Sequence, residues 1–164
     1  MTAELRADAQ RPPFDADSYD FFEAAAPSPL FIDSPPAGRV YPEDFRAAVP
    51  ERVLRGAEDW EVDILFADAP EAGASLLAAR FPRAYIDPNR RLDDSVAMNH
   101  PNKGAEILRL SGLPAGHRHA LQIEIKRALY MDEATVTATE GFAPLRANLK
   151  RLVAELVAWT GRSG

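Results

Sequence analysis

The sequence predicts an α/β domain, and two patterns carry that prediction. Short apolar runs of strand length, such as Leu30-Phe31-Ile32, are separated by segments whose apolar residues recur at helical spacing. The clearest helical stripe consists of leucines at 145, 149, 152 and 156 with Trp159. Strands that alternate with helices are typical of α/β folds.

The first half of the chain gives a leader, a strand and a helix. Residues 1–18 are polar and proline-bearing, so we expect a mobile leader before a single α/β domain over 19–164. An aromatic patch of Tyr19, Phe21 and Phe22 is expected to dock this leader. Residues 30–33 are predicted to form the first strand, and a helix is expected from Glu51 to between residues 67 and 70.

The second half predicts shorter elements before a long final helix. Residues 74–80 fit either a strand or a helix, and residues 119–126 alternate in polarity as a half-buried strand does. Gly161 lies just beyond the final helix. The remaining expected elements are strands at 83–87 and 95–99 and a helix at 103–110.

Composition narrows the functional classes. The 164 residues are 46% apolar and 27% charged, which suits one globular domain. A net charge of −6 argues against a nucleic-acid surface, and the lack of cysteine excludes disulfides and thiolate metal sites. No apolar run approaches a membrane span, and we expect a cytoplasmic protein.

Three loops that follow expected strands could converge on one edge of the sheet, at residues 33–39, 87–91 and 124–133. Ligands of α/β sheets bind at the carboxyl ends of strands. Asn89, Arg90 and Arg91 lie in the second loop, and arginine binds carboxylates through paired, charged hydrogen bonds. These side chains either bind a carboxylate ligand or belong to a solvated turn.

Carboxylates give two further candidates. Asp59 and Asp63 are four residues apart on an expected helix, so they could share a face and hold a metal, or they form an acidic solvent-facing flank. Glu124 lies within an apolar strand pattern. It could serve as a general base there, or it could face solvent and pair with Lys126 or Arg127. His117 and His119 are too few to define a zinc site.

Several blocks together resemble the N-formylglutamate amidohydrolases. They run in the family's order and are Leu-Phe-Ile-Asp-Ser-Pro from Leu30, Gly-Arg-Val-Tyr-Pro from Gly38, Gly-Ala-Glu-Asp from Gly56 with Val62-Asp63, Phe-Pro-Arg-Ala-Tyr-Ile-Asp from Phe81 with Asn89-Arg90, Leu-Gln-Ile-Glu from Leu121 and Tyr-Met-Asp-Glu from Tyr130. The resemblance implies a mixed sheet with helices on both faces, similar to zinc carboxypeptidases and aspartoacylases.

The resemblance also implies roles for individual residues. The implied reaction is hydrolysis of N-formylglutamate to formate and glutamate, in histidine breakdown, by a water bound to zinc. Glu124 matches the general base, Asn89 and Arg90 match the pair that binds the substrate carboxylate, and Asp63, with Asp59 beside it, matches the acidic metal ligand.

Two departures from the family pattern argue against full activity. The family's first loop reads Ser-Pro-His-Ser-Gly, with a metal-binding histidine, and Pro36 replaces that histidine here. A long family segment with a second metal-binding histidine is absent before Ser95. We therefore expect weak zinc binding and a catalytically impaired, shortened relative. The alternatives are a non-catalytic binding relative or an engineered, minimised scaffold, and exposed sheet edges make a homodimer plausible.

Overall fold

The computed structural model describes residues 18–35, 37–43, 45–56, 58–87 and 106–161. Several sequence predictions lie outside these ranges. They are the leader, the substituted loop position Pro36, the candidate carboxylate-binding residues Asn89 and Arg90, and the strand expected at 95–99.

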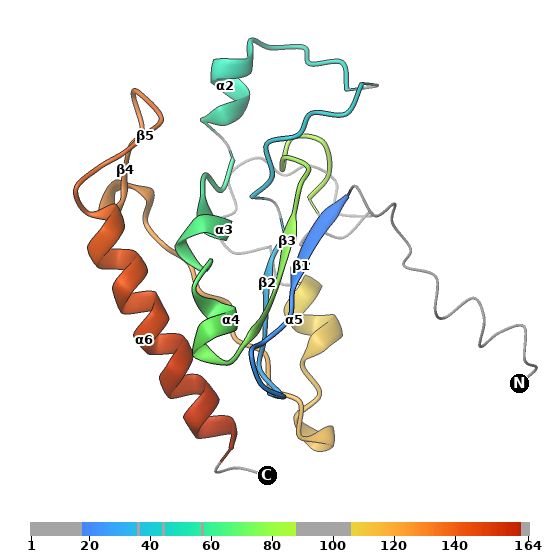
Figure 1. Cartoon of the computed structure of the whole chain (residues 1–164). Helices are drawn as coiled ribbons and strands as arrows, with labels where there is room; N and C mark the ends of the chain where they lie inside the picture. The colour runs from blue at the N-terminus through green and yellow to red at the C-terminus, as the bar shows by residue number, and fades with distance from the viewer. Residues whose placement is uncertain (1–17, 36, 44, 57, 88–105, 162–164) are drawn as a thin grey trace, which may run out of the picture.

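A three-stranded mixed sheet lies at the centre of the fold (Figure 1). Its strands are β1 (Tyr19–Phe22), β2 (Phe31–Ser34) and β3 (Ser75–Ala79), in the order β1-β3-β2. β1 runs antiparallel to β3, whereas β2 runs parallel to it. The predicted α/β class with a mixed sheet is confirmed. The strand expected at 30–33 is present, and the segment 74–80 is a strand rather than a helix.

Helices lie on both sides of this sheet. The helices are α2 (Glu51–Arg55), α3 (Val62–Leu65), α4 (Ala69–Ala72), α5 (Glu106–Ser111) and α6 (Phe142–Thr160). Figure 1 shows α3, α4 and α6 on the left of the sheet and α5 on its right. Two short 3₁₀ turns, η1 (Pro114–Gly116) and η2 (Arg127–Leu129), and a hairpin of β4 (Met131–Asp132) and β5 (Thr137–Ala138) complete the described chain.

The core lies between the sheet and α6. Leu76 of β3, Leu65 of α3 and Val153 of α6 are each no more than 2% exposed. Leu149 and Val153 are one helical turn apart and both face inward, whereas Leu152 and Trp159 of the predicted stripe are 39% and 46% exposed. The final helix is thus confirmed, and the helix expected at 103–110 appears as α5 over its described part.

The single helix expected from Glu51 to about residue 70 is wrong. The chain leaves helical geometry after Arg55 and re-enters it at Val62, and Glu61 adopts a left-handed φ of 52°. The helical spacing of apolar residues continues across the break, but these residues do not form one buried helix face. Val53 is 48% exposed while Leu65 is buried, so the two parts pack differently.

Two expected strands are also wrong. Residues 83–87 form a turn in which the amides of Tyr85 and Ile86 both donate to the Pro82 carbonyl. Residues 119–126 belong to no strand, and the face predicted to be buried is open, with Leu121 71% exposed and Ile123 40% exposed. Among the described residues, this extended segment has no strand partner, and of its predicted inward face Ile125 packs against the core.

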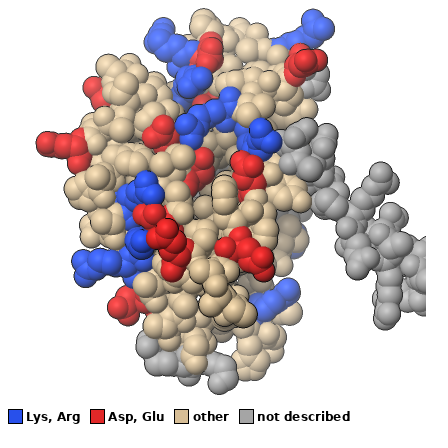
Figure 2. Space-filling model, in the orientation of Figure 1, with Lys and Arg blue, Asp and Glu red and all other residues tan. Residues whose placement is uncertain are grey.

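Surface charge is mixed in sign. Figure 2 shows lysines and arginines interspersed with aspartates and glutamates on the face that it displays. Within the described residues, no helix combines the length and apolar character needed to cross a bilayer.

Candidate functional site

The site is built at the carboxyl edge of β2 and β3. These strands are parallel, so both chains leave the sheet at the same edge, where Ser34 pairs in register with Ala78. Beyond the edge, Ala37 forms a bridge with Pro82, and the Val40 amide donates to the Arg80 carbonyl over 2.8 Å. The segments that leave β2 and β3 therefore meet at this edge, whereas the second predicted loop, residues 87–91, lies almost wholly outside the described residues.

Gly38 is what allows these two loops to meet. A Cβ atom at this position would overlap the carbonyl carbon and oxygen of Arg80. Only glycine permits so close an approach of two backbones. The position of the loop thus depends on the absence of a Cβ atom at Gly38.

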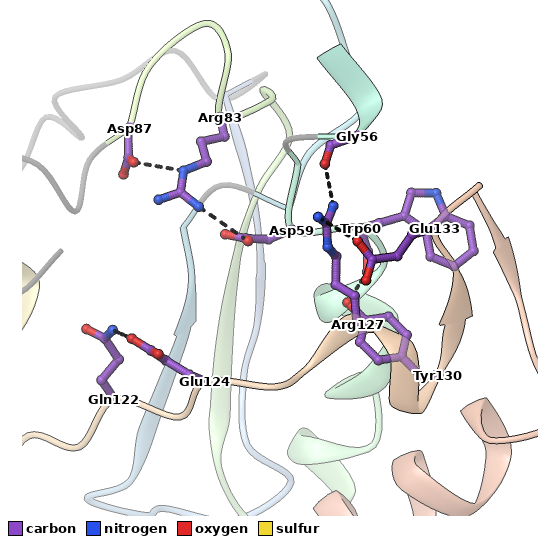
Figure 3. A network of polar contacts seen from close by, with 10 residues as sticks. All are labelled: Gly56, Asp59, Trp60, Arg83, Asp87, Gln122, Glu124, Arg127, Tyr130 and Glu133. Carbon is purple, nitrogen blue, oxygen red and sulfur yellow. Dashed lines mark hydrogen bonds and ion pairs between the residues drawn. The ribbon is translucent and has the colours of Figure 1, made fainter. Parts of the chain in front are cut away.

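The turn after β3 brings Arg83 between two carboxylates (Figure 3). Its Nη1 lies 3.5 Å from Asp59 Oδ1, and its Nε donates to Asp87 Oδ2 over 2.9 Å. Burial has the largest effect on the pKa of Asp59 and raises it. The positive charges of Arg83 and Arg127 lower this pKa, and the negative charge of Asp87 raises it. Asp59 is therefore a half-buried carboxylate that is already paired with a cation.

Glu124 lies on a separate segment, below the Asp59–Arg83 pair in the view of Figure 3. Gln122 Nε2 donates to Glu124 Oε1 over 2.7 Å, so the partner is neither Lys126 nor Arg127. The Glu124 side chain is exposed. Within the part of the chain that the structure describes, Glu124 therefore lacks the burial expected for a general base.

Asp63 belongs to a different cluster from Asp59. Arg39 donates to Asp63 Oδ2 over 3.3 Å and to Glu61 Oε1 over 3.4 Å. The other oxygen of Asp63, Oδ1, is buried and has no hydrogen-bond partner among the described residues. Asp59 precedes α3 and Asp63 lies within it, so the expected shared helix face is wrong.

A tyrosine and a buried glutamate join the segment that follows β2 to the loop between α2 and α3. The Tyr41 hydroxyl donates to Glu58, which is only 3% exposed. Burial and this hydrogen bond raise the pKa of Tyr41 above its usual range. Tyr41, which follows β2, thus holds Glu58, the residue immediately before Asp59.

The structure also places Arg83, Tyr130 and Glu133 in this network, three residues for which the sequence predicted no role, and Arg127, which was predicted only as an ion-pair partner of Glu124. One local signal was available, because Arg83 and Asp87 have the i, i+4 spacing of an ion pair. The bonds from Arg127 to Gly56 and from Tyr130 to Trp60 join residues 71 and 70 positions apart, and no local pattern predicts them.

The zinc implied by the family resemblance does not fit the described residues. Across the described ranges, no three histidine, cysteine, aspartate or glutamate side chains come together as a metal site would require. Asp59 and Asp63 lie in separate clusters, and each is paired with an arginine. His119 contacts the ring of Trp159 instead, with 6.1 Å between ring centroids.

Comparison with known proteins identifies a family for part of the chain. A sequence model of the N-formylglutamate amidohydrolase family matches residues 28–98. N-formylglutamate deformylase of Pseudomonas putida is 40% identical over 67 residues, which cover 40% of this chain and 25% of that relative. The crystal structure of N-formylglutamate amidohydrolase from Ralstonia eutropha JMP134 superposes with a TM-score of 0.78 and 24% identity, over 90% of this chain and 100% of that chain.

The matched sequence spans β2, α2, α3, α4 and β3, and therefore includes Asp59 and Arg83. The similarity to zinc carboxypeptidases stays a prediction from the resemblance. Residues 28–98 are thus similar in sequence to the N-formylglutamate amidohydrolase family, and the chain has the fold of an N-formylglutamate amidohydrolase of known structure.

Proposed function

We propose that this chain is an N-formylglutamate amidohydrolase-like protein that binds a small dicarboxylate, N-formylglutamate or a close analogue, with impaired hydrolysis. The ligand would bind at the carboxyl edge of β2 and β3, where ligands of α/β sheets gather. We also infer that it acts in the cytoplasm.

The observation that carries the proposal is the Asp59–Arg83–Asp87 network. It lies at this edge, and its turn leads directly into the Asn89-Arg90 pair that matches the family's carboxylate-binding residues. A guanidinium suits a substrate carboxylate because it donates two parallel, charged hydrogen bonds. The network would fix the turn from which that pair extends.

The same network supports impaired hydrolysis. The reaction adds water to the formyl carbon and breaks its bond to nitrogen, which releases formate and glutamate. Glu124 is the candidate to accept the proton of that water and return it to the leaving amine. However, Glu124 is exposed and bonded to Gln122, and Asp59 is committed to Arg83. No group among these is arranged to activate a water.

Calorimetric titration of N-formylglutamate into the full chain tests the binding half of the proposal. We expect a dissociation constant of roughly millimolar or tighter. Arg90→Ala should weaken binding by about tenfold, equivalent to about 1.4 kcal/mol, because it removes the paired donors. Arg91→Ala is the matched control and should bind like wild type.

Glu124→Gln separates binding from chemistry in the same titration. We expect unchanged affinity, because the proposed role of this carboxylate is proton transfer and the amide keeps its size. Absence of any binding to wild type, or equal losses in Arg90→Ala and Arg91→Ala, would contradict the proposal.

A further inference from the structure

Two side chains of one short segment hold both ends of the loop that carries Asp59. Arg127 Nη1 donates to the Gly56 carbonyl over 2.6 Å, and the Tyr130 hydroxyl donates to the Trp60 carbonyl over 3.0 Å. Figure 3 shows both contacts on the side of the network away from Arg83. The loop between α2 and α3 is thus gripped at its first and last peptide groups.

This loop needs an external hold because its own geometry is unfavourable. Glu61 has a left-handed φ of 52°, a backbone conformation that residues other than glycine rarely adopt. Arg127 and Tyr130 donate to the carbonyls of Gly56 and Trp60, near the two ends of the loop, and these contacts favour the observed conformation.

Arg127 and Tyr130 together form a clamp on the Asp59 loop, and both side chains are themselves held in place. Tyr130 is 1% exposed and belongs to the core, where its ring contacts Phe142 edge-on. The second nitrogen of Arg127, Nη2, pairs with Glu133 over 3.0 Å, so the guanidinium is held from both sides. Movement of either side chain would therefore require movement of the 127–133 segment.

The clamp also reaches Glu124. Residues 119–126 belong to no strand, so the sheet does not position this carboxylate. Ile125, the next residue, packs against the hydrophobic core, and Arg127, two residues further on, donates to the Gly56 carbonyl at the start of the Asp59 loop. The position of Glu124 relative to Asp59 therefore depends in part on the Arg127 contact.

We propose that Arg127 and Tyr130 are positioning residues that dock the Glu124 segment onto the Asp59 loop, and that ligand binding at this edge requires the docked arrangement. The ligand class rests on the proposed function, whereas the docking itself does not. Neither residue touches the ligand, so both act through the loop.

Trp60 provides a direct optical readout of the docking. The chain has two tryptophans, and Trp159 lies on α6, so Trp159→Phe leaves Trp60 as the sole indole. In this background, Tyr130→Phe removes only the hydroxyl that holds the Trp60 carbonyl, and Arg127→Met removes the charged donors at nearly constant length. Arg118→Met, an exposed arginine on the same connecting segment, is the matched control.

We expect Arg127→Met and Tyr130→Phe to shift Trp60 emission to longer wavelength and to increase its quenching by iodide, because the loop is released. Arg127→Lys should restore part of the change, since it keeps one charged donor. N-formylglutamate should bind Arg127→Met about tenfold more weakly than the background, with recovery in Arg127→Lys and no change in Arg118→Met.

Unchanged Trp60 emission in both Arg127→Met and Tyr130→Phe would overturn the inference, as would an equal shift in Arg118→Met. If Arg127→Met fails to fold by circular dichroism, Tyr130→Phe decides, because it deletes a single oxygen. If the background itself binds no N-formylglutamate, the proposed function fails while the emission readout still tests the docking.

Discussion

Gly38→Ala should be one of the most destabilising single substitutions in the chain, although it adds only one methyl group. The new Cβ would overlap the backbone carbonyl of Arg80, so the two loops at the sheet edge must separate. Separation breaks the 2.8 Å hydrogen bond from Val40 to Arg80 and the bridge between Ala37 and Pro82.

The expected cost follows from those losses. Each backbone hydrogen bond contributes about 1 kcal/mol, and forcing atoms into a packed site costs about 1–3 kcal/mol. We therefore expect a loss of about 3–5 kcal/mol in the free energy of unfolding. With a urea dependence of roughly 2 kcal/mol per molar, the unfolding midpoint should fall by about 2 M.

Gly56→Ala is the matched control for this prediction. Gly56 has an ordinary φ of −65°, and the nearest atom to an added Cβ is the Val53 carbonyl oxygen at 3.4 Å. Alanine should be neutral or stabilise by up to about 1 kcal/mol, because it restricts the unfolded chain. Equal urea midpoints for Gly38→Ala and wild type would refute the close approach of the two loops.

Three further predictions concern charge and association. Asp68→Asn should cost about 0.5–1 kcal/mol at pH 7, because it removes the two hydrogen bonds from Arg146, at 2.9 and 2.7 Å, between partly exposed side chains. Since Arg146 lowers the pKa of Asp68, this difference should disappear in urea titrations as the pH falls below the usual aspartate range. Burial raises the pKa of Asp33 from 3.8 to about 6, so wild-type stability should fall as the pH rises through that interval. Asp33→Asn should accordingly gain about 1–2 kcal/mol at pH 7, allowing for partial solvent screening, and nothing below pH 3.8; an equal effect at both pH values would contradict this. Phe21 and Phe31 are each 53% exposed and stack at 6.4 Å, so sedimentation equilibrium should find a dimer that Phe21→Ser weakens, and a monomer at every concentration would count against it.

The sequence predicted those parts of the fold that depend on one face of one element. The final helix and the strand near residue 31 have clear local patterns and both are present, but the buried face of α6 runs through Leu149 and Val153 and leaves Leu152 and Trp159 of the predicted stripe exposed. The pattern failed at residues 119–126, where the polarity alternates but Leu121 stays exposed. Alternation describes a side-chain period and says nothing about whether a partner strand is present.

The candidate site was less predictable because its contacts are distant in sequence. The family blocks identified Asp59 and Glu124, yet they gave no role to Arg83, which holds Asp59. The bond from Tyr130 to Trp60 crosses 70 residues and depends on the chain breaking before α3. That break is visible only in the left-handed Glu61, since the apolar spacing continues through it.

Formate release from N-formylglutamate, measured on the full chain with and without added zinc, tests the central claim most directly. We expect no release above the uncatalysed rate in either condition, alongside measurable binding of the same compound. Turnover of roughly 1–1000 per second, the usual range for enzymes, would contradict the claim that Asp59 and Glu124 are not arranged for catalysis.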